Sequence, residues 1–146
     1  MSSRIEDTKA VGIDANMLLY AYDNSEGDKH KSASGLLRSA LTGKTALIIP
    51  IQVLAEFYSV ISRGKLGMTR EDAVGIIEDI MAIPDFRIVQ GDMSTFLRAA
   101  DINASTGKHF WDCMLASVLV QNGAEKIITE NTKDFSGIET VNPFKN

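Results

Sequence analysis

The 146-residue sequence has a single cysteine, Cys113, and no long run of apolar residues. A lone cysteine cannot form an internal disulfide, which excludes a disulfide-stapled secreted scaffold. A membrane-spanning helix needs about 20 consecutive apolar residues, so we expect no membrane association. The first ten residues mix both charges and lack an apolar core, which argues against a signal peptide. Together these absences predict a cytoplasmic protein.

An excess of positive charge is also missing, because 15 Lys and Arg residues face 19 Asp and Glu residues, for a net charge of −4. Nucleic-acid binding depends on Lys and Arg that neutralise phosphates, so the overall charge argues against nucleic acid as a partner. The remaining composition, with 45% hydrophobic and 23% charged residues, is ordinary for a globular protein. The length predicts one domain over residues 1–146.

Short apolar runs of strand length alternate with longer segments of helical periodicity. The runs lie at 11–13, 45–49, 86–89 and 126–129, and 139–141 can add an edge strand. The intervening segments predict helices after residue 16 and at about 28–42, 51–63, 69–82, 92–106 and 108–120. This order predicts an α/β fold in which helices cover both faces of a mainly parallel sheet of four or five strands.

Carboxylates follow the strands of this expected sheet. Asp14 ends the first strand, where a parallel sheet presents side chains to a ligand crevice. Asp is also a favoured helix N-cap, which is the structural interpretation of Asp14. Asp134 occupies the polar turn after the 126–129 strand. Strand-end carboxylates are therefore candidates for a site on one edge of the sheet.

Two more carboxylates interrupt helices that are otherwise apolar. Glu56 belongs to a narrow polar stripe on the 51–63 helix, and either faces solvent or points into a cleft. Asp112 stands among apolar residues in the first turn of the 108–120 helix. The helix dipole alone could explain an acid there, at about 0.3–1 kcal/mol, whereas an unpaired buried charge would cost several kcal/mol. Asp112 is therefore either a dipole partner or a site residue.

Convergence of these four carboxylates would call for a cation. Like charges held together raise one another's pKa unless a divalent ion lies among them. Oxygen ligands without a His or Cys cluster select Mg²⁺ or Mn²⁺ over Zn²⁺. Such metals position and deprotonate a water and stabilise the charge that develops on a phosphodiester under attack. The pattern therefore indicates metal-dependent phosphoryl chemistry.

Four segments together resemble the PIN-domain proteins, and most closely the VapC-type toxins of bacterial and archaeal toxin–antitoxin pairs. They are, in order, IDANMLLY at 13–20, VLAEFY at 53–58, FWDCMLA at 110–116 and ITENTKDF at 128–135. Many relatives place an Asp where Asn131 stands, and others place the acid three residues later, at the position of Asp134. The resemblance therefore leaves open which of the two completes the site.

The resemblance implies a three-layer α/β/α fold and an endoribonuclease that depends on Mg²⁺ or Mn²⁺. It makes Asp14 and Asp112 the principal metal ligands, has Glu56 and Asp134 complete the pocket, and adds nearby supporting residues, which are Asn16, Thr129 and Asn131. It also implies an RNA substrate, a cognate antitoxin and a homodimer. Removing four site carboxylates changes the formal charge from −4 to 0, which weakens the electrostatic argument against RNA.

Other functions fit parts of the same sequence. A PIN-like RNA-processing nuclease without an antitoxin would carry the same residues. A metal-free α/β binding module would share the fold pattern but would leave the carboxylates unexplained. A phosphatase with an Asp nucleophile usually has a second Asp close by in sequence, which the segment Asp14-Ala-Asn16 lacks.

Overall fold

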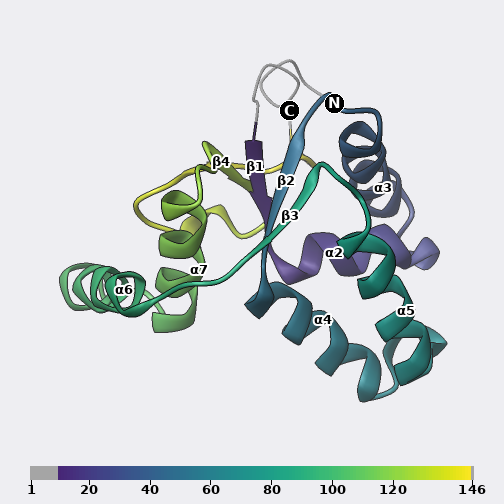
Figure 1. Ribbon diagram of the computed structural model, residues 1–146, viewed down its shortest axis with the longest axis horizontal. Coiled ribbons are helices and arrows are strands. Elements are labelled where there is room, and N and C mark those ends of the chain that lie inside the picture. Colours follow the sequence, from purple (N-terminus) through teal and green to yellow (C-terminus); the bar gives the residue numbers. More distant parts are fainter. Residues whose placement is uncertain (1–9, 146) are drawn as a thin grey trace.

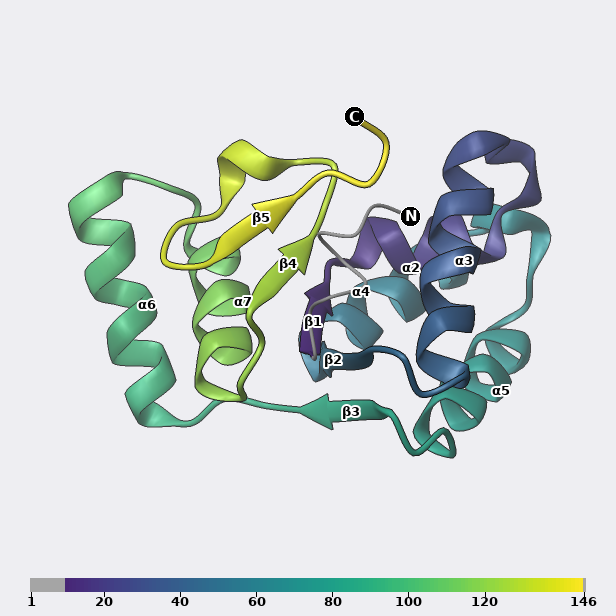
Figure 2. The ribbon, with the colours of Figure 1, turned by 90° about the horizontal axis from the view of Figure 1, so that it is seen from above.

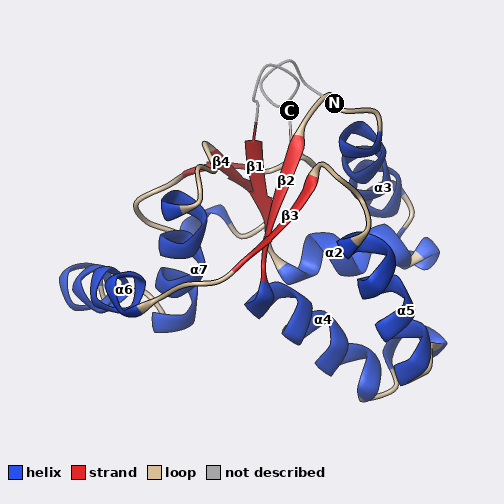
Figure 3. Cartoon of the chain, viewed as in Figure 1, coloured by secondary structure: helices blue, strands red, loops and turns tan. Residues whose placement is uncertain are grey.

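A computed structural model describes residues 10–145 and contains one sheet of five parallel strands. Figure 3 shows the sheet in red among the blue helices, and Figure 2 shows β5 beside β4. The strand order is β3-β2-β1-β4-β5, and each neighbouring pair is parallel. The strand bounds are β1 Ala10–Ile13, β2 Ala46–Pro50, β3 Phe86–Val89, β4 Lys126–Ile128 and β5 Glu139–Val141. The predicted α/β class is confirmed, and the optional edge strand is present.

Helices cover both faces of the sheet. Figure 1 shows α6 and α7 on one side, with α2, α3, α4 and α5 on the other. The helix bounds are α2 Ala15–Tyr22, α3 Asp28–Leu41, α4 Ile51–Ser62, α5 Arg70–Met81, α6 Met93–Thr106 and α7 Phe110–Gln121. The result is the three-layer α/β/α arrangement. No helix within residues 10–145 has the length and apolar character needed to cross a bilayer.

The middle of the sheet forms the core, because the two central strands are enclosed on both faces. β1 is buried along its whole length, as is β2 after its first residue. Gly12 in β1 permits a close approach of α7, since a Cβ at this position would lie 2.4 Å from Leu119 Cδ2. This packing brings α7 directly over β1 and so places the N-terminal turn of α7 near the end of that strand.

Local sequence signals set most helix ends. Thr69 and Asp72 form the capping box that starts α5, and a second capping box at Asp92 and Thr95 starts α6. Gly64 and Gly107 adopt positive φ angles of 93° and 71° just after α4 and α6. Short 3₁₀ turns occupy three connections, and these are η1 Asn24–Glu26, η2 Lys65–Gly67 and η3 Thr132–Asp134.

Candidate active site

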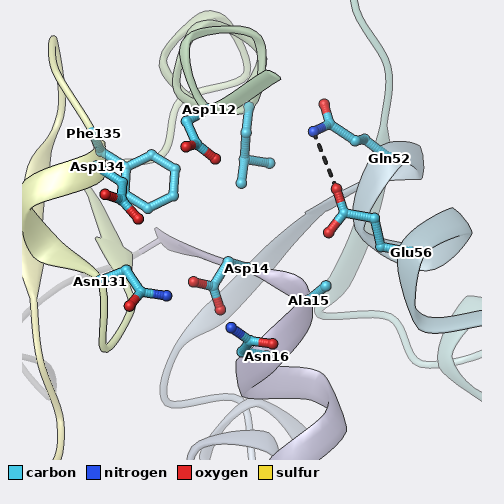
Figure 4. A pocket seen from close by; sticks show the side chains of 10 residues that line it. Asp14, Ala15, Asn16, Gln52, Glu56, Asp112, Asn131, Asp134 and Phe135 are labelled. Carbon is cyan, nitrogen blue, oxygen red and sulfur yellow. Dashed lines mark hydrogen bonds between the residues drawn. The ribbon is translucent and has the colours of Figure 1, made fainter. Parts of the chain in front are cut away.

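One pocket lies at the carboxyl edge of the sheet, where β1, β2 and β4 end (Figure 4). The structure brings all four sequence-predicted carboxylates to this pocket. No Lys, Arg or His belongs to its lining. The lining residues are Asp14, Ala15, Asn16, Gln52, Glu56, Asp112, Leu115, Asn131, Asp134 and Phe135.

Asp14 serves as a helix cap and a pocket residue at once. It is only 8% exposed, and its Oδ1 accepts a hydrogen bond from the Met17 backbone N–H at 3.1 Å. Its Oδ2 accepts a second bond from the Thr129 hydroxyl at 2.6 Å. Burial raises the pKa of the Asp14 carboxyl, although both hydrogen bonds act in the opposite direction. The capping and functional interpretations therefore do not compete at this residue.

Thr129 and Asn131 connect β4 to Asp14. The Thr129 hydroxyl is completely buried, donates to Asp14 and accepts from the Asn131 backbone N–H at 3.0 Å. Asn131 itself lines the pocket beside Asp14 (Figure 4). Thr129 and Asn131 therefore both lie next to Asp14. The Thr129 hydroxyl holds both the Asp14 carboxylate and the start of the turn that follows β4.

Glu56 is exposed and also lines the pocket, so both of its sequence-based placements hold. The Gln52 amide lies one turn earlier on α4 and donates to Glu56 Oε1 at 3.5 Å (Figure 4). The same amide nitrogen donates to the Trp111 backbone carbonyl at 3.2 Å. Gln52 therefore links α4 to the first turn of α7. Its place in the polar stripe with Glu56 is a sequence signal for this role.

Asp112 lies in the first turn of α7 and is partly buried. Burial raises the pKa of its carboxyl, the charges of Asp134 and Glu56 raise it further, and His109 lowers it. Within residues 10–145, the Asp112 side chain accepts no hydrogen bond. His109 and the N-terminus of α7 therefore favour a charge on Asp112 that burial and the neighbouring carboxylates disfavour.

Asp134 reaches the pocket from the exposed turn η3, which is tied to the start of α7. The Lys108 ammonium donates to the backbone carbonyls of Lys133 at 2.8 Å and Phe135 at 3.2 Å. Lys108 and its two partners lie 25 and 27 residues apart in the sequence, and no local sequence pattern predicts these contacts. Asn131 and Asp134 both line the pocket, so the structure does not make them alternatives.

The donor chemistry of the pocket fits a hard divalent cation. Its charged groups are all carboxylates, and its neutral polar side chains add the amide oxygens of Asn16, Gln52 and Asn131. Among residues 10–145, however, no three His, Cys, Asp or Glu side chains are close enough to form a ready ligand cluster. The carboxylates thus share a pocket without forming a closed ligand set.

Comparison with known proteins identifies the fold. A family model, the PIN domain, matches residues 11–139. A crystal structure of VapBC2 from Rickettsia felis, bound to a DNA fragment from its promoter, aligns with a TM-score of 0.68 at 17% identity, covering 91% of this chain and 98% of that one. A toxin–antitoxin complex from Klebsiella pneumoniae aligns with a TM-score of 0.63 at 20% identity, covering 93% and 99%.

A third structure is VapC20 from Mycobacterium tuberculosis, described as a sarcin-ricin loop cleaving toxin. It aligns with a TM-score of 0.61 at 12% identity, covering 80% of this chain and 86% of that one. Comparison with curated protein sequences gave no significant match. The structural likenesses establish the fold. Because the family model extends from β1 into β5 and includes every carboxylate of the pocket, the chain belongs to the PIN domain family.

Proposed function

We propose that this protein is a metal-dependent endoribonuclease that hydrolyses RNA phosphodiester bonds. The observation that carries the proposal is the pocket itself, which four carboxylates line and to whose lining no cationic side chain belongs. Such a site favours a divalent cation, because the acids otherwise repel one another. A PIN domain and its VapC-like fold support nuclease chemistry over a passive binding module.

Asp14 and Asp112 would hold the Mg²⁺ or Mn²⁺, and Glu56 and Asp134 would complete the pocket. The bound ion would supply positive charge for the phosphate and a lowered pKa for water. Asp14 is held in place by Met17 and Thr129, which fixes one ligand before binding. Glu56, with Gln52 at one of its two oxygens, is free to accept a hydrogen bond from the attacking water.

The reaction needs no covalent intermediate. Water attacks phosphorus, the bond to the leaving oxygen breaks, and the products are a phosphate monoester and a hydroxyl end. Glu56 and Asp134 would orient the water and take up one of its protons, and a solvent water would supply the proton that the leaving oxygen needs to become the hydroxyl end. This division of work follows from exposure, because Asp14 is buried while Glu56 and Asp134 are exposed at the mouth of the pocket.

We further infer that the protein is the toxin of a toxin–antitoxin pair. The supporting observations are the similar folds of the toxin–antitoxin complex from Klebsiella pneumoniae and of VapBC2 from Rickettsia felis. A net charge of −4 suits an antitoxin with a basic segment. An RNA-processing nuclease that acts without an antitoxin is the second candidate, because it would need the same pocket.

A homodimer is also part of the proposal. Four large apolar side chains on α6 and at the start of α7 are strongly exposed, and we call them the α6 patch: Met93, Phe96, Leu97 and Trp111. The rings of Phe96 and Trp111 both contact that of Phe110, at centroid distances of 5.7 and 5.4 Å. A group of exposed large apolar side chains of this kind commonly marks a protein–protein interface.

The function is tested by RNA cleavage with purified protein. Cleavage of single-stranded or structured RNA is expected in Mg²⁺ or Mn²⁺, and excess chelator should abolish it. Asp14→Asn should lose activity by more than about 100-fold, since even the outer partners of metal ligands typically contribute 10–100-fold. Undiminished cleavage in chelator would exclude the metal-dependent site.

A further inference from the structure

Glu130 is held by two helices that are far from it in sequence. The Tyr20 hydroxyl at the end of α2 donates to Glu130 Oε1 at 2.6 Å. The Lys29 ammonium at the start of α3 lies 2.6 Å from Glu130 Oε2. Both carboxylate oxygens are therefore occupied. We call these three residues, Tyr20, Lys29 and Glu130, the Glu130 clamp.

Residues 142–144, near the C-terminus, pack against the Glu130 clamp. The Phe144 ring packs edge-on against Tyr20, with centroids 5.6 Å apart, and the Lys29 ammonium lies 5.2 Å from the Tyr20 ring centroid and 5.7 Å from that of Phe144. The Asn142 side-chain amide donates to the Glu130 backbone carbonyl at 3.5 Å. Segments from three parts of the chain thus converge on one residue.

Glu130 stands between two residues of the pocket region. Thr129 precedes it and donates to Asp14, and Asn131 follows it and lines the pocket. Asp14 caps the start of α2, and Tyr20 lies six residues further along the same helix. The turn after β4 is therefore attached to α2 at two points, through Thr129 to Asp14 and through Glu130 to Tyr20. A turn attached at two points cannot rotate about either contact alone.

We propose that the Glu130 clamp is a positioning device that sets the distance between the two sides of the acidic pocket. One side is Asp14, the N-cap of α2, and the other is the segment that carries Asn131 and Asp134. None of the three clamp residues lines the pocket, so the clamp acts on metal binding only through the turn. This inference rests on the proposed metal-dependent nuclease function.

A purely structural role predicts something different. A partly exposed ion pair such as Lys29 and Glu130 usually contributes little to stability. If the clamp only stabilised the fold, its loss would lower the melting temperature and leave the metal affinity of the folded protein unchanged. If it positions the turn, its loss weakens metal binding even at temperatures where the variant is fully folded.

The test is the dissociation constant for Mn²⁺, measured by calorimetry well below the melting temperature on the full chain. The variants are Glu130→Gln, Lys29→Met and Tyr20→Phe. We expect Mn²⁺ binding to weaken roughly 3- to 10-fold, less than the 10–100-fold typical of groups that contact metal ligands directly. Lys29→Arg keeps the charge and should restore most of the affinity.

RNA cleavage provides a second readout. In Glu130→Gln, kcat at limiting Mn²⁺ should fall and saturating Mn²⁺ should restore it, while KM for RNA stays unchanged. The control is Asp92→Asn at the start of α6, where Asp92 accepts bonds from the Thr95 N–H at 3.2 Å and the Ser94 hydroxyl at 2.7 Å. This variant removes the charge of a comparably hydrogen-bonded carboxylate outside the pocket and should lower stability without changing Mn²⁺ affinity.

The outcomes separate the two proposals. Wild-type protein that binds Mn²⁺ and cleaves RNA, together with clamp variants of unchanged affinity, would overturn the clamp and leave the nuclease function standing. Wild-type protein that neither binds Mn²⁺ nor cleaves RNA would overturn both. Weakened binding in the clamp variants, with normal binding in Asp92→Asn, supports the positioning role.

Discussion

At the scale of single residues, a substitution of Asp112 best distinguishes an effect on catalysis from an effect on stability. In Asp112→Asn, loss of a proposed metal ligand should nearly abolish RNA cleavage. The metal-free protein should keep its free energy of unfolding or gain slightly, because the substitution removes the repulsion of Asp112 by Asp134 and Glu56, which raises the pKa of Asp112. Chemical denaturation and cleavage assays measure the two effects independently.

The helix-dipole interpretation of Asp112 predicts the opposite effects on stability and on activity. Removing a first-turn acid would lower stability by about 0.3–1 kcal/mol and leave activity almost intact. Mn²⁺ provides the control, because metal binding should raise the melting temperature of the wild type by mass action and that of the variant much less. A variant that keeps both the metal-induced shift and cleavage would remove Asp112 from the site.

Sequence patterns located the four carboxylates but not the contacts that fix them. Asp14 could be recognised because it follows a buried strand and precedes a helix, and Asp112 because it interrupts an apolar helix. The partner of Asp14, Thr129, lies 115 residues away, and only the resemblance to a family suggested it. A pairing over that separation depends on the register of β1 against β4, which local periodicity does not encode.

At the scale of elements, the strands and helix starts follow the sequence closely. β3 and β5 have the predicted bounds, and the Thr69 capping box begins α5 where expected. The attachment of η3 to α7 through Lys108 was not predicted, since Lys108 resembles any exposed basic residue in the sequence. Helices and strands that have a clear hydrophobic periodicity and capping residues can therefore be predicted, whereas the contacts of a single side chain that joins two elements cannot.

The Lys108 contact predicts how η3 behaves when it is released. Lys108→Met removes two hydrogen bonds to the carbonyls of residues 133 and 135. Amide hydrogen exchange in 131–136 should become faster, and cleavage should fall because Asp134 is held less firmly. Lys133→Met is the matched control, since it also removes one positive charge and the Lys133 ammonium makes no hydrogen bond or ion pair within residues 10–145. Equal effects from both variants would show that charge, not attachment, matters.

At the scale of the whole molecule, the Glu130 clamp gives the free energy of unfolding a defined pH dependence. Contacts with Lys29 and Tyr20 lower the pKa of Glu130 below its ordinary value of 4.5. A lowered folded-state pKa means that the ionised carboxylate contributes stability in full above that ordinary value and loses it as the pH falls through the folded-state pKa.

Wild type should therefore be more stable than Glu130→Gln at neutral pH, and the difference should shrink as the pH falls below 4.5. Urea unfolding at several pH values measures it. The comparison isolates Glu130, because Asp14 and Asp112 have raised pKa values that contribute with the opposite sign in both proteins. A difference that grows on acidification would contradict the assigned contacts.

The α6 patch predicts the oligomeric state. Leu97 is 61% exposed, and Leu97→Lys should shift sedimentation from dimer to monomer, because a charge in an apolar interface is unpaired and desolvated. Met81 on α5 is equally exposed at 63%, so Met81→Lys is the matched control and should leave the dimer intact. A wild-type monomer at all concentrations would remove the dimer from the proposal.

The central claim is that the carboxylate pocket at the ends of β1, β2 and β4 holds the divalent cation. Anomalous diffraction from crystals grown with Mn²⁺ tests it most directly. The expected result is a peak within about 2.5 Å of oxygens from both Asp14 and Asp112, in the range of oxygen ligation, and its loss in Asp112→Asn. An ordered Mn²⁺ elsewhere, with the pocket filled only by water, would contradict the claim.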